Sequence, residues 1–95
     1  MSGRIEGQVV SLAENGNLVT DITNDRLEGA PRSDVVSVTC DEHVTTGIFE
    51  AEHNQPEMTL VAVLGASGAL ELEIVGDSAG IMLGVRVGEK VVVKW

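Results

Sequence analysis

The sequence has almost no aromatic side chains: they make up 2% of its 95 residues, tyrosine is absent, and the two present are Phe49 and Trp95. The 43% of residues that are hydrophobic are therefore mainly Val, Leu, Ile and Ala, and these must build the core. A chain of this length removes only about 60–65% of its unfolded surface from water on folding. These values predict one domain over residues 1–95 and exclude a two-domain enzyme.

Basic residues are also few, with 6 Lys and Arg against 15 Asp and Glu, which gives a formal net charge of −9. The six are scattered along the chain and form no patch. Because nucleic acids and anionic membranes are bound chiefly through Lys and Arg, we expect neither as a partner.

The chain has one cysteine, Cys40, which cannot form an intramolecular disulfide bond. Residues 1–4 lack the apolar run of a secretory signal, and no apolar segment approaches the roughly 18–20 residues that span a bilayer. This combination predicts a cytoplasmic protein.

Short β-branched runs separated by turn residues predict an antiparallel barrel or sandwich. Asn15-Gly16 predicts a two-residue type I′ hairpin turn, in which both residues have positive φ. Asp77 and Ser78 could cap one short helical turn, near residues 78–83, that ends at Gly84. The predicted strands are 4–13, 18–22, 35–40, 44–50, 58–64, 69–75 and 91–95, with loops at 23–34 and 53–57.

Residues 69–75 alternate well between apolar and acidic side chains, so Glu71 and Glu73 share one face of a strand. Two carboxylates on one face could form a catalytic dyad. A solvated outer face is the preferred interpretation, because the intervening leucines need the opposite face for the core. His53, in a polar loop, is predicted to be an isolated, exposed histidine.

Residues 40–43 offer a thiol, two carboxylates and an imidazole, but no second Cys or nearby His completes a metal site. We therefore expect a small buried Cys40 beside an exposed acidic turn, and no metal. Ser67 lies in Gly-Ala-Ser-Gly, which is neither a nucleophile elbow nor a phosphate-binding loop. No catalytic residue is predicted.

Several segments, taken together and in order, resemble the carboxy-terminal domain of the S-adenosylmethionine hydroxide adenosyltransferases, relatives of the fluorinating and chlorinating enzymes. They are residues 16–22, Phe49, 64–72, 76–79 and 83–91. The resemblance extends over nearly the whole chain, from about residue 7 to residue 93. It implies an all-β fold: a small antiparallel, partly open β-barrel of about six to seven strands with one short helical turn.

In that family the barrel follows a larger α/β domain, and the site lies between the large domain of one subunit of a trimer and the small domain of its neighbour. By resemblance, the adenine side of the site comprises Asn17, Phe49, Gly76 and Ala79, and the methionine side comprises Ala66 and Ser67. The family's turn usually reads Asp-x-Phe-Gly-Asn, whereas this chain has Ala13 and Asn15 in place of the acid and the aromatic ring. Glu14 is one residue away from the missing acid.

Two functions follow from the resemblance. The first is a stand-alone, non-catalytic β-barrel module that acts in self-association, with a trimer as the implied assembly, or in docking to a partner. The second is a module that binds adenosine or S-adenosylmethionine and completes an active site in trans with a separately encoded large domain. An enzyme acting alone is disfavoured, because in the family the water-activating groups belong to the large domain and 95 residues supply no second wall for a closed site.

Overall fold

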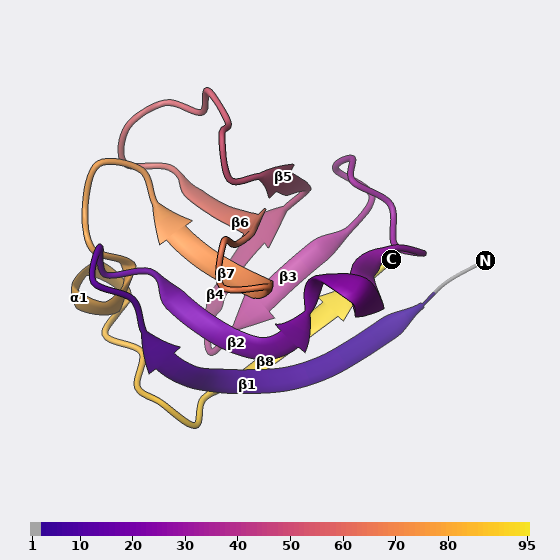
Figure 1. Cartoon of the computed structure of the whole chain (residues 1–95), viewed down its shortest axis with the longest axis horizontal. Helices are drawn as coiled ribbons and strands as arrows, with labels where there is room; N and C mark the ends of the chain where they lie inside the picture. Colours follow the sequence, from indigo (N-terminus) through magenta and orange to yellow (C-terminus); the bar gives the residue numbers. More distant parts are fainter. Residues whose placement is uncertain (1–2) are drawn as a thin grey trace.

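The computed structural model describes residues 3–95, which form eight strands, one short α-helix and one 3₁₀ turn. The strands make a single sheet, in the order β4-β3-β8-β1-β2-β7-β6-β5, that curls into a nearly closed barrel (Figure 1). In chain order the elements are β1 (Arg4–Leu12), β2 (Leu18–Thr23), η1 (Asn24–Leu27), β3 (Ser37–Cys40), β4 (His43–Thr46), β5 (Ile48–Glu50), β6 (Leu60–Leu64), β7 (Ala69–Ile74), α1 (Ala79–Leu83) and β8 (Lys90–Lys94).

The predicted all-β, partly open barrel with one short helix is confirmed. It has one strand more than expected because Gly47, with φ of 85°, divides the extended run after residue 43 into β4 and β5. Each neighbouring pair in the sheet is antiparallel except β5 and β6, which are parallel. Parallel neighbours cannot be joined by a tight turn, so residues 51–59 cross over from the end of β5 to the start of β6.

The barrel closes at a seam where β4, at one end of the sheet, lies beside β6, the neighbour of the other end strand β5. There the hydroxyl of Thr45 donates to the carbonyl oxygen of Leu60 at 2.8 Å. The register shifts in two strand pairs, between Val9 and Ser11 in β1–β2 and between Val19 and Thr23 in β2–β7. Such bulges bend a strand and increase its twist, which brings the two edges of the sheet towards each other.

The hairpin between β1 and β2 differs from the predicted type I′ turn. Gly16 has φ of 91°, but Asn15 does not have positive φ. The amide of Gly16 donates to the Ala13 carbonyl, and the amide of Ala13 donates to the Asn17 carbonyl, both at 2.9 Å. This is a three-residue loop with a type I turn followed by a left-handed glycine, so one positive-φ residue suffices.

The core lies inside the barrel and contains aliphatic side chains and Cys40, without an aromatic ring among its buried residues in the described part of the chain. Leu18, Thr20 and Ile22 point inward from β2, as their alternation predicts. Leu27, at the end of η1, is the buried anchor expected in the 23–34 loop. Trp95 packs against the edge of this core.

Helix α1 begins after Ser78, whose hydroxyl accepts a hydrogen bond from the amide of Ile81, and it ends at Gly84 with φ of 66°. Both caps agree with the prediction from sequence. Within residues 3–95 no helix is long and apolar enough to cross a membrane.

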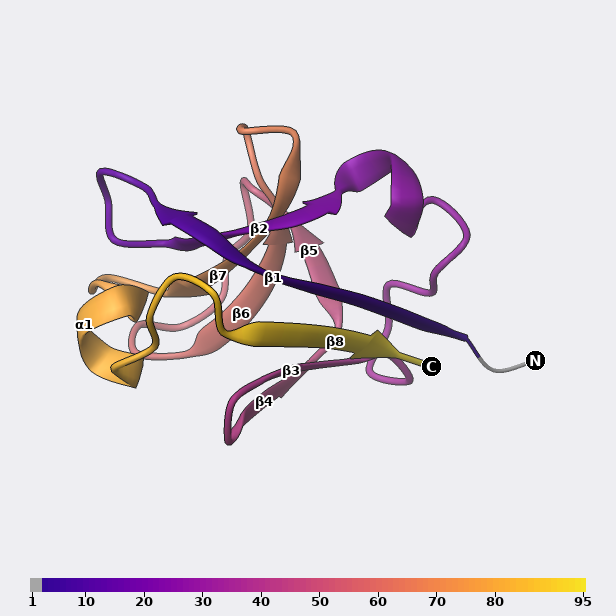
Figure 2. The same cartoon turned by 90° about the horizontal axis from the view of Figure 1, so that it is seen from below.

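The two ends of the described chain lie side by side. Gly3 and Trp95 exchange backbone hydrogen bonds at 2.8 Å and 3.0 Å, which extends the pairing of β1 with β8. Figures 1 and 2, seen from directions 90° apart, both place α1 at one end of the molecule and the two ends of the described chain towards the other (Figure 2).

Candidate functional site

The outer face of β6 and β7 carries two valines and two glutamates. Val61 lies opposite Glu73, and Val63 lies opposite Glu71. These side chains point away from the barrel core, yet Val61, Val63 and Glu71 are only 1%, 2% and 7% exposed. The prediction that the two glutamates form a solvated face is therefore wrong. Alternation along β7 defines which face they occupy, but it holds no information about the segment that covers this face, residues 51–57, which we call the strap.

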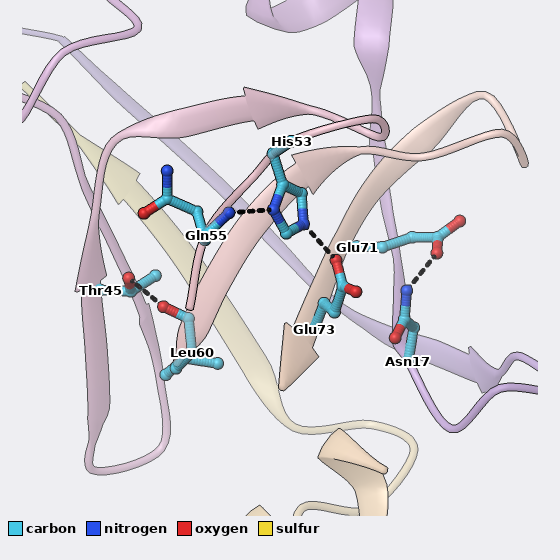
Figure 3. Close-up of polar contacts among 7 residues, drawn as sticks. All are labelled: Asn17, Thr45, His53, Gln55, Leu60, Glu71 and Glu73. Atoms are coloured by element: carbon cyan, nitrogen blue, oxygen red, sulfur yellow. Dashed lines mark hydrogen bonds and ion pairs between the residues drawn. The ribbon is translucent and has the colours of Figure 1, made fainter. Parts of the chain in front are cut away.

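Glu71 is held by two neutral donors. The Asn17 amide nitrogen Nδ2 donates to Oε1 at 3.1 Å (Figure 3), and the Ser67 hydroxyl donates to Oε2 at 2.7 Å. Asn17 is itself fixed by the hairpin, because its backbone amide donates to Oδ1 of Asn15 at 3.1 Å. Gly65 is required at its position, since an added Cβ would overlap the Glu71 side chain. One buried carboxylate thus connects the β1–β2 hairpin with the turn between β6 and β7.

His53 is buried and not exposed as predicted: its side chain is 7% accessible, and Nε2 lies 2.7 Å from Oε1 of Glu73 (Figure 3). The amide of Gln55 donates to Nδ1 of His53 at 3.2 Å. A nitrogen that accepts a hydrogen bond carries no proton, so the ring proton is on Nε2 and is donated to Glu73. The ring also packs at a tilt against Phe49, with 6.1 Å between the ring centroids.

A cleft of about 530 Å³ opens beside these groups. It brings together three of the predicted site residues, Asn17 from the adenine side and Ala66 and Ser67 from the methionine side. Three carboxylates border it, those of Glu14, Glu71 and Glu73, and its described lining includes no Lys, Arg or His. The cleft is therefore acidic, and its electrostatic character suits a cation.

The remaining predicted site residues lie elsewhere. Phe49 borders a second cavity, of about 450 Å³, at the seam between β4 and β6. Gly76, with φ of 82°, lies beside the side chain of Glu57. Ala79 is fully buried at the start of α1. The residues expected on the adenine side are thus divided among different parts of the barrel.

Cys40 is buried, and Asp41 and Glu42 beside it are exposed, as the sequence predicted. Burial, followed by the negative charges of Glu89 and Asp41, raises the pKa of the Cys40 thiol to about 11. The thiol is therefore protonated at neutral pH, which lowers its reactivity. Asp41, Glu42 and His43 present ligand atoms within 4.8 Å of one another, while Nε2 of His43 lies 3.2 Å from the carbonyl oxygen of Leu83.

One end of the barrel carries a group of exposed apolar side chains, which we call the end surface. The loop after α1 is joined to β1 by a hydrogen bond from the amide of Gly88 to the Val9 carbonyl, at 2.7 Å. Helix α1 packs on β1 so closely that a Cβ at Gly80 would lie 3.2 Å from Cδ2 of Leu12. The end surface comprises Val10, Leu12, Ile81, Met82 and Val87, which are 43%, 54%, 81%, 49% and 60% exposed.

Sequence reasoning missed the roles of Glu71, Glu73 and His53. Their contacts join residues 54 and 20 positions apart, Asn17 with Glu71 and His53 with Glu73. No periodicity or local motif connects such distant positions. The one available signal was the presence of two glutamates in one strand and of a histidine in the loop that precedes the neighbouring strand in the sequence.

The fold and this cleft define a small, nearly closed β-barrel domain with an acidic outer cleft. The chain belongs to the family of SAM hydroxide adenosyltransferase C-terminal domains, whose family model matches residues 7–92. None of the curated proteins is similar enough to count as a relative.

Two solved structures share this fold. An uncharacterized conserved protein from Thermotoga maritima is 21% identical, with a TM-score of 0.76 over 95% of this chain and 35% of its own. A conserved hypothetical protein from Thermus thermophilus is 29% identical, with a TM-score of 0.71 over 90% of this chain and 33% of its own. The chain therefore spans about a third of the length of the solved structures that it matches.

Proposed function

We propose that this barrel is a non-catalytic docking module of its family, and that it associates through the end surface with a second copy of itself. The end surface carries the proposal. Its five exposed apolar side chains come from α1, the loop after it and the end of β1 beside them, and exposed apolar patches on small proteins mark interaction sites.

Burial of the end surface would favour association. Ile81 is 81% exposed and Leu12 is 54% exposed. Full burial of such a side chain contributes about 1.5–3 kcal/mol, so Ile81 alone would contribute about 1–2 kcal/mol per copy. The net charge of −9 on each copy opposes association. The Debye length, beyond which salt screens this repulsion, is about 8 Å at 0.15 M and about 3 Å at 1 M ionic strength. Association should therefore strengthen as salt is added.

Sedimentation equilibrium at both salt concentrations tests this proposal, and a trimer is the assembly that the family resemblance implies. Ile81→Ser should weaken association about tenfold or more. Val35→Ser is the matched control, because Val35 is 65% exposed but precedes β3 near the opposite end. A protein that stays monomeric at about 1 mM in 1 M salt would exclude self-association, and docking to a separately encoded large domain would then be the remaining form of the proposal.

A second candidate function is favoured by the acidic cleft. In this case the module binds an adenosyl ligand and completes an active site in trans with a separate large domain. The bond from Asn17 to Glu71 uses one amide hydrogen and leaves the carbonyl oxygen and the second hydrogen available for the edge of an adenine ring. Three carboxylates and no basic side chain in the lining favour S-adenosylmethionine, which carries a sulfonium and an ammonium group, over neutral adenosine.

Calorimetric titration distinguishes the ligands. S-adenosylmethionine should release or absorb more heat than adenosine or methionine, at protein concentrations above about 100 μM. Asn17→Ala should weaken this binding, whereas Asn54→Ala, in the exposed part of the strap, should not. The absence of heat with all three ligands would remove the second candidate and leave the docking proposal unaffected.

A further inference from the structure

The strap, residues 51–57, is attached to the barrel by very little. Within residues 3–95, one hydrogen bond joins it to another element, the bond between His53 and Glu73. The bond from the Gln55 amide to His53 is internal to the strap. Backbone pairing with the sheet stops at Glu50 and begins again at Met58, whose amide donates to the Val75 carbonyl at 2.8 Å. A segment with so few attachments can open without unfolding the barrel.

The strap covers apolar surface. Val61 and Val63 are almost fully buried, but they lie on the outer face of β6 and are not part of the core cluster inside the barrel. Five of the seven strap residues are exposed, whereas the His53 side chain is buried against Glu73 of β7. The strap is therefore a cover held by one inserted side chain.

The strap also lies between the two cavities. Ala51 and Glu73 border the acidic cleft, whereas Phe49 and Gln55 border the cavity at the seam. His53 connects the two sides, because its ring packs on Phe49 while its Nε2 binds Glu73 (Figure 3). Glu52 and Glu57 on the strap carry the same charge as Glu71 and Glu73 beneath it, and repulsion between these carboxylates favours separation of the strap from β7.

We propose that the strap is a gate, fastened by the hydrogen bond between His53 and Glu73. When this bond opens, the strap leaves the outer face of β6 and β7, Val61 and Val63 become accessible, and the two cavities join into one groove. This inference is independent of the proposed function, because it concerns neither the end surface nor self-association.

Amide hydrogen exchange tests the gate. Glu73→Leu keeps the bulk of the side chain but removes the acceptor, and it should accelerate exchange of the Gln55 amide about tenfold or more. Glu73→Gln keeps an acceptor oxygen and should exchange within about twofold of the wild type. The amides of Val63 and Leu72, which lie in paired strands, should be unaffected in both variants and report that the barrel remains folded.

A second measurement reports access to the covered surface. With cysteine introduced as Val63→Cys, the thiol should react with Ellman's reagent about tenfold faster when Glu73→Leu is also present, while buried Cys40 stays unreactive. His53→Phe provides a second variant if Glu73→Leu does not fold, since it keeps a ring against Phe49 and removes both nitrogens; its readout is the Val63→Cys thiol, because the change also removes the acceptor of the Gln55 amide. Unchanged amide exchange and unchanged thiol reactivity in a folded variant would overturn the proposal that the strap is a gate. An equal acceleration of exchange at every amide would also overturn it, because this result would show global unfolding.

Discussion

Replacement of Glu71 with alanine removes the acceptor of two hydrogen bonds that tie the hairpin and the 65–68 turn to β7. Asn17 is 6% exposed and borders the cleft, so its Nδ2 would lose its acceptor and regain only part of this bonding from water in the cleft. A buried donor without an acceptor costs about 1–3 kcal/mol. Ser67, which is exposed, can bond to solvent instead and adds less. We therefore expect Glu71→Ala to lower the free energy of unfolding by about 2–4 kcal/mol.

The Glu71→Gln variant keeps the hydrogen bonds but removes the negative charge, so it distinguishes their contributions to stability. The amide oxygen of glutamine can accept from Asn17, and its nitrogen can donate to the Ser67 hydroxyl, which serves as donor or acceptor. The same change removes a buried negative charge that has no basic partner in the cleft. This variant should differ from the wild type by less than about 1 kcal/mol.

Thermal and urea unfolding measure both effects. For a domain of this size, 1 kcal/mol shifts Tm by about 4–8 °C, so Glu71→Ala should lower Tm by roughly 8–32 °C. Glu52→Ala, at an exposed position of the strap, serves as the control. If Glu71→Ala proved as stable as this control, the buried network would not hold the hairpin, and the argument from unsatisfied donors would be wrong.

Two further predictions concern Gly16 and Cys40. Gly16→Ala should destabilise the protein by more than about 1 kcal/mol, because φ is 91° and the new Cβ would lie 2.7 Å from the Ser78 Cα. Gly68→Ala is the control: φ is 90° there too, but the position faces open space, so this variant should lose stability through backbone strain alone. Equal losses of stability in unfolding experiments would contradict the steric argument. The pKa of Cys40 is raised from 9.0 to about 11, so iodoacetamide at pH 8 should label this thiol only after the protein unfolds. The contribution of Cys40 to the free energy of unfolding should decrease as pH rises from about 9 to 11, because the thiol loses its proton at lower pH in the unfolded state than in the folded state. Rapid labelling of the native protein, measured by mass spectrometry, would refute the burial of this thiol.

Much of the barrel follows from local patterns in the sequence. The alternation in residues 69–75 identifies β7 and its inward leucines, and Ser78 with Gly84 marks the limits of α1, because both signals lie within a few residues of what they determine. The turn at Asn15-Gly16 was correctly located but its type was wrong. The glycine needs positive φ, and the number of loop residues around it depends on the register of the two strands.

The candidate site was less predictable because it depends on tertiary contacts. The pattern of β7 places Glu71 and Glu73 outside the barrel, where glutamate is ordinarily solvated. What changes their environment is the crossover between β5 and β6, which carries His53 over this face. A parallel strand pair cannot be read from one short run such as residues 48–50, so the strap and its contacts could not be anticipated.

The pairing of Gly3 with Trp95 has a consequence for how the barrel can be linked to other polypeptides. Because both ends leave the sheet from adjacent strands, a segment attached at either terminus starts from the same place, at the end of the molecule away from α1 (Figure 2). The two ends are also close enough for a short linker to join them, and new ends could be opened at the exposed residues 86–88. Anchoring through either terminus, in an assay or in a fusion, therefore leaves α1 and the end surface facing outward.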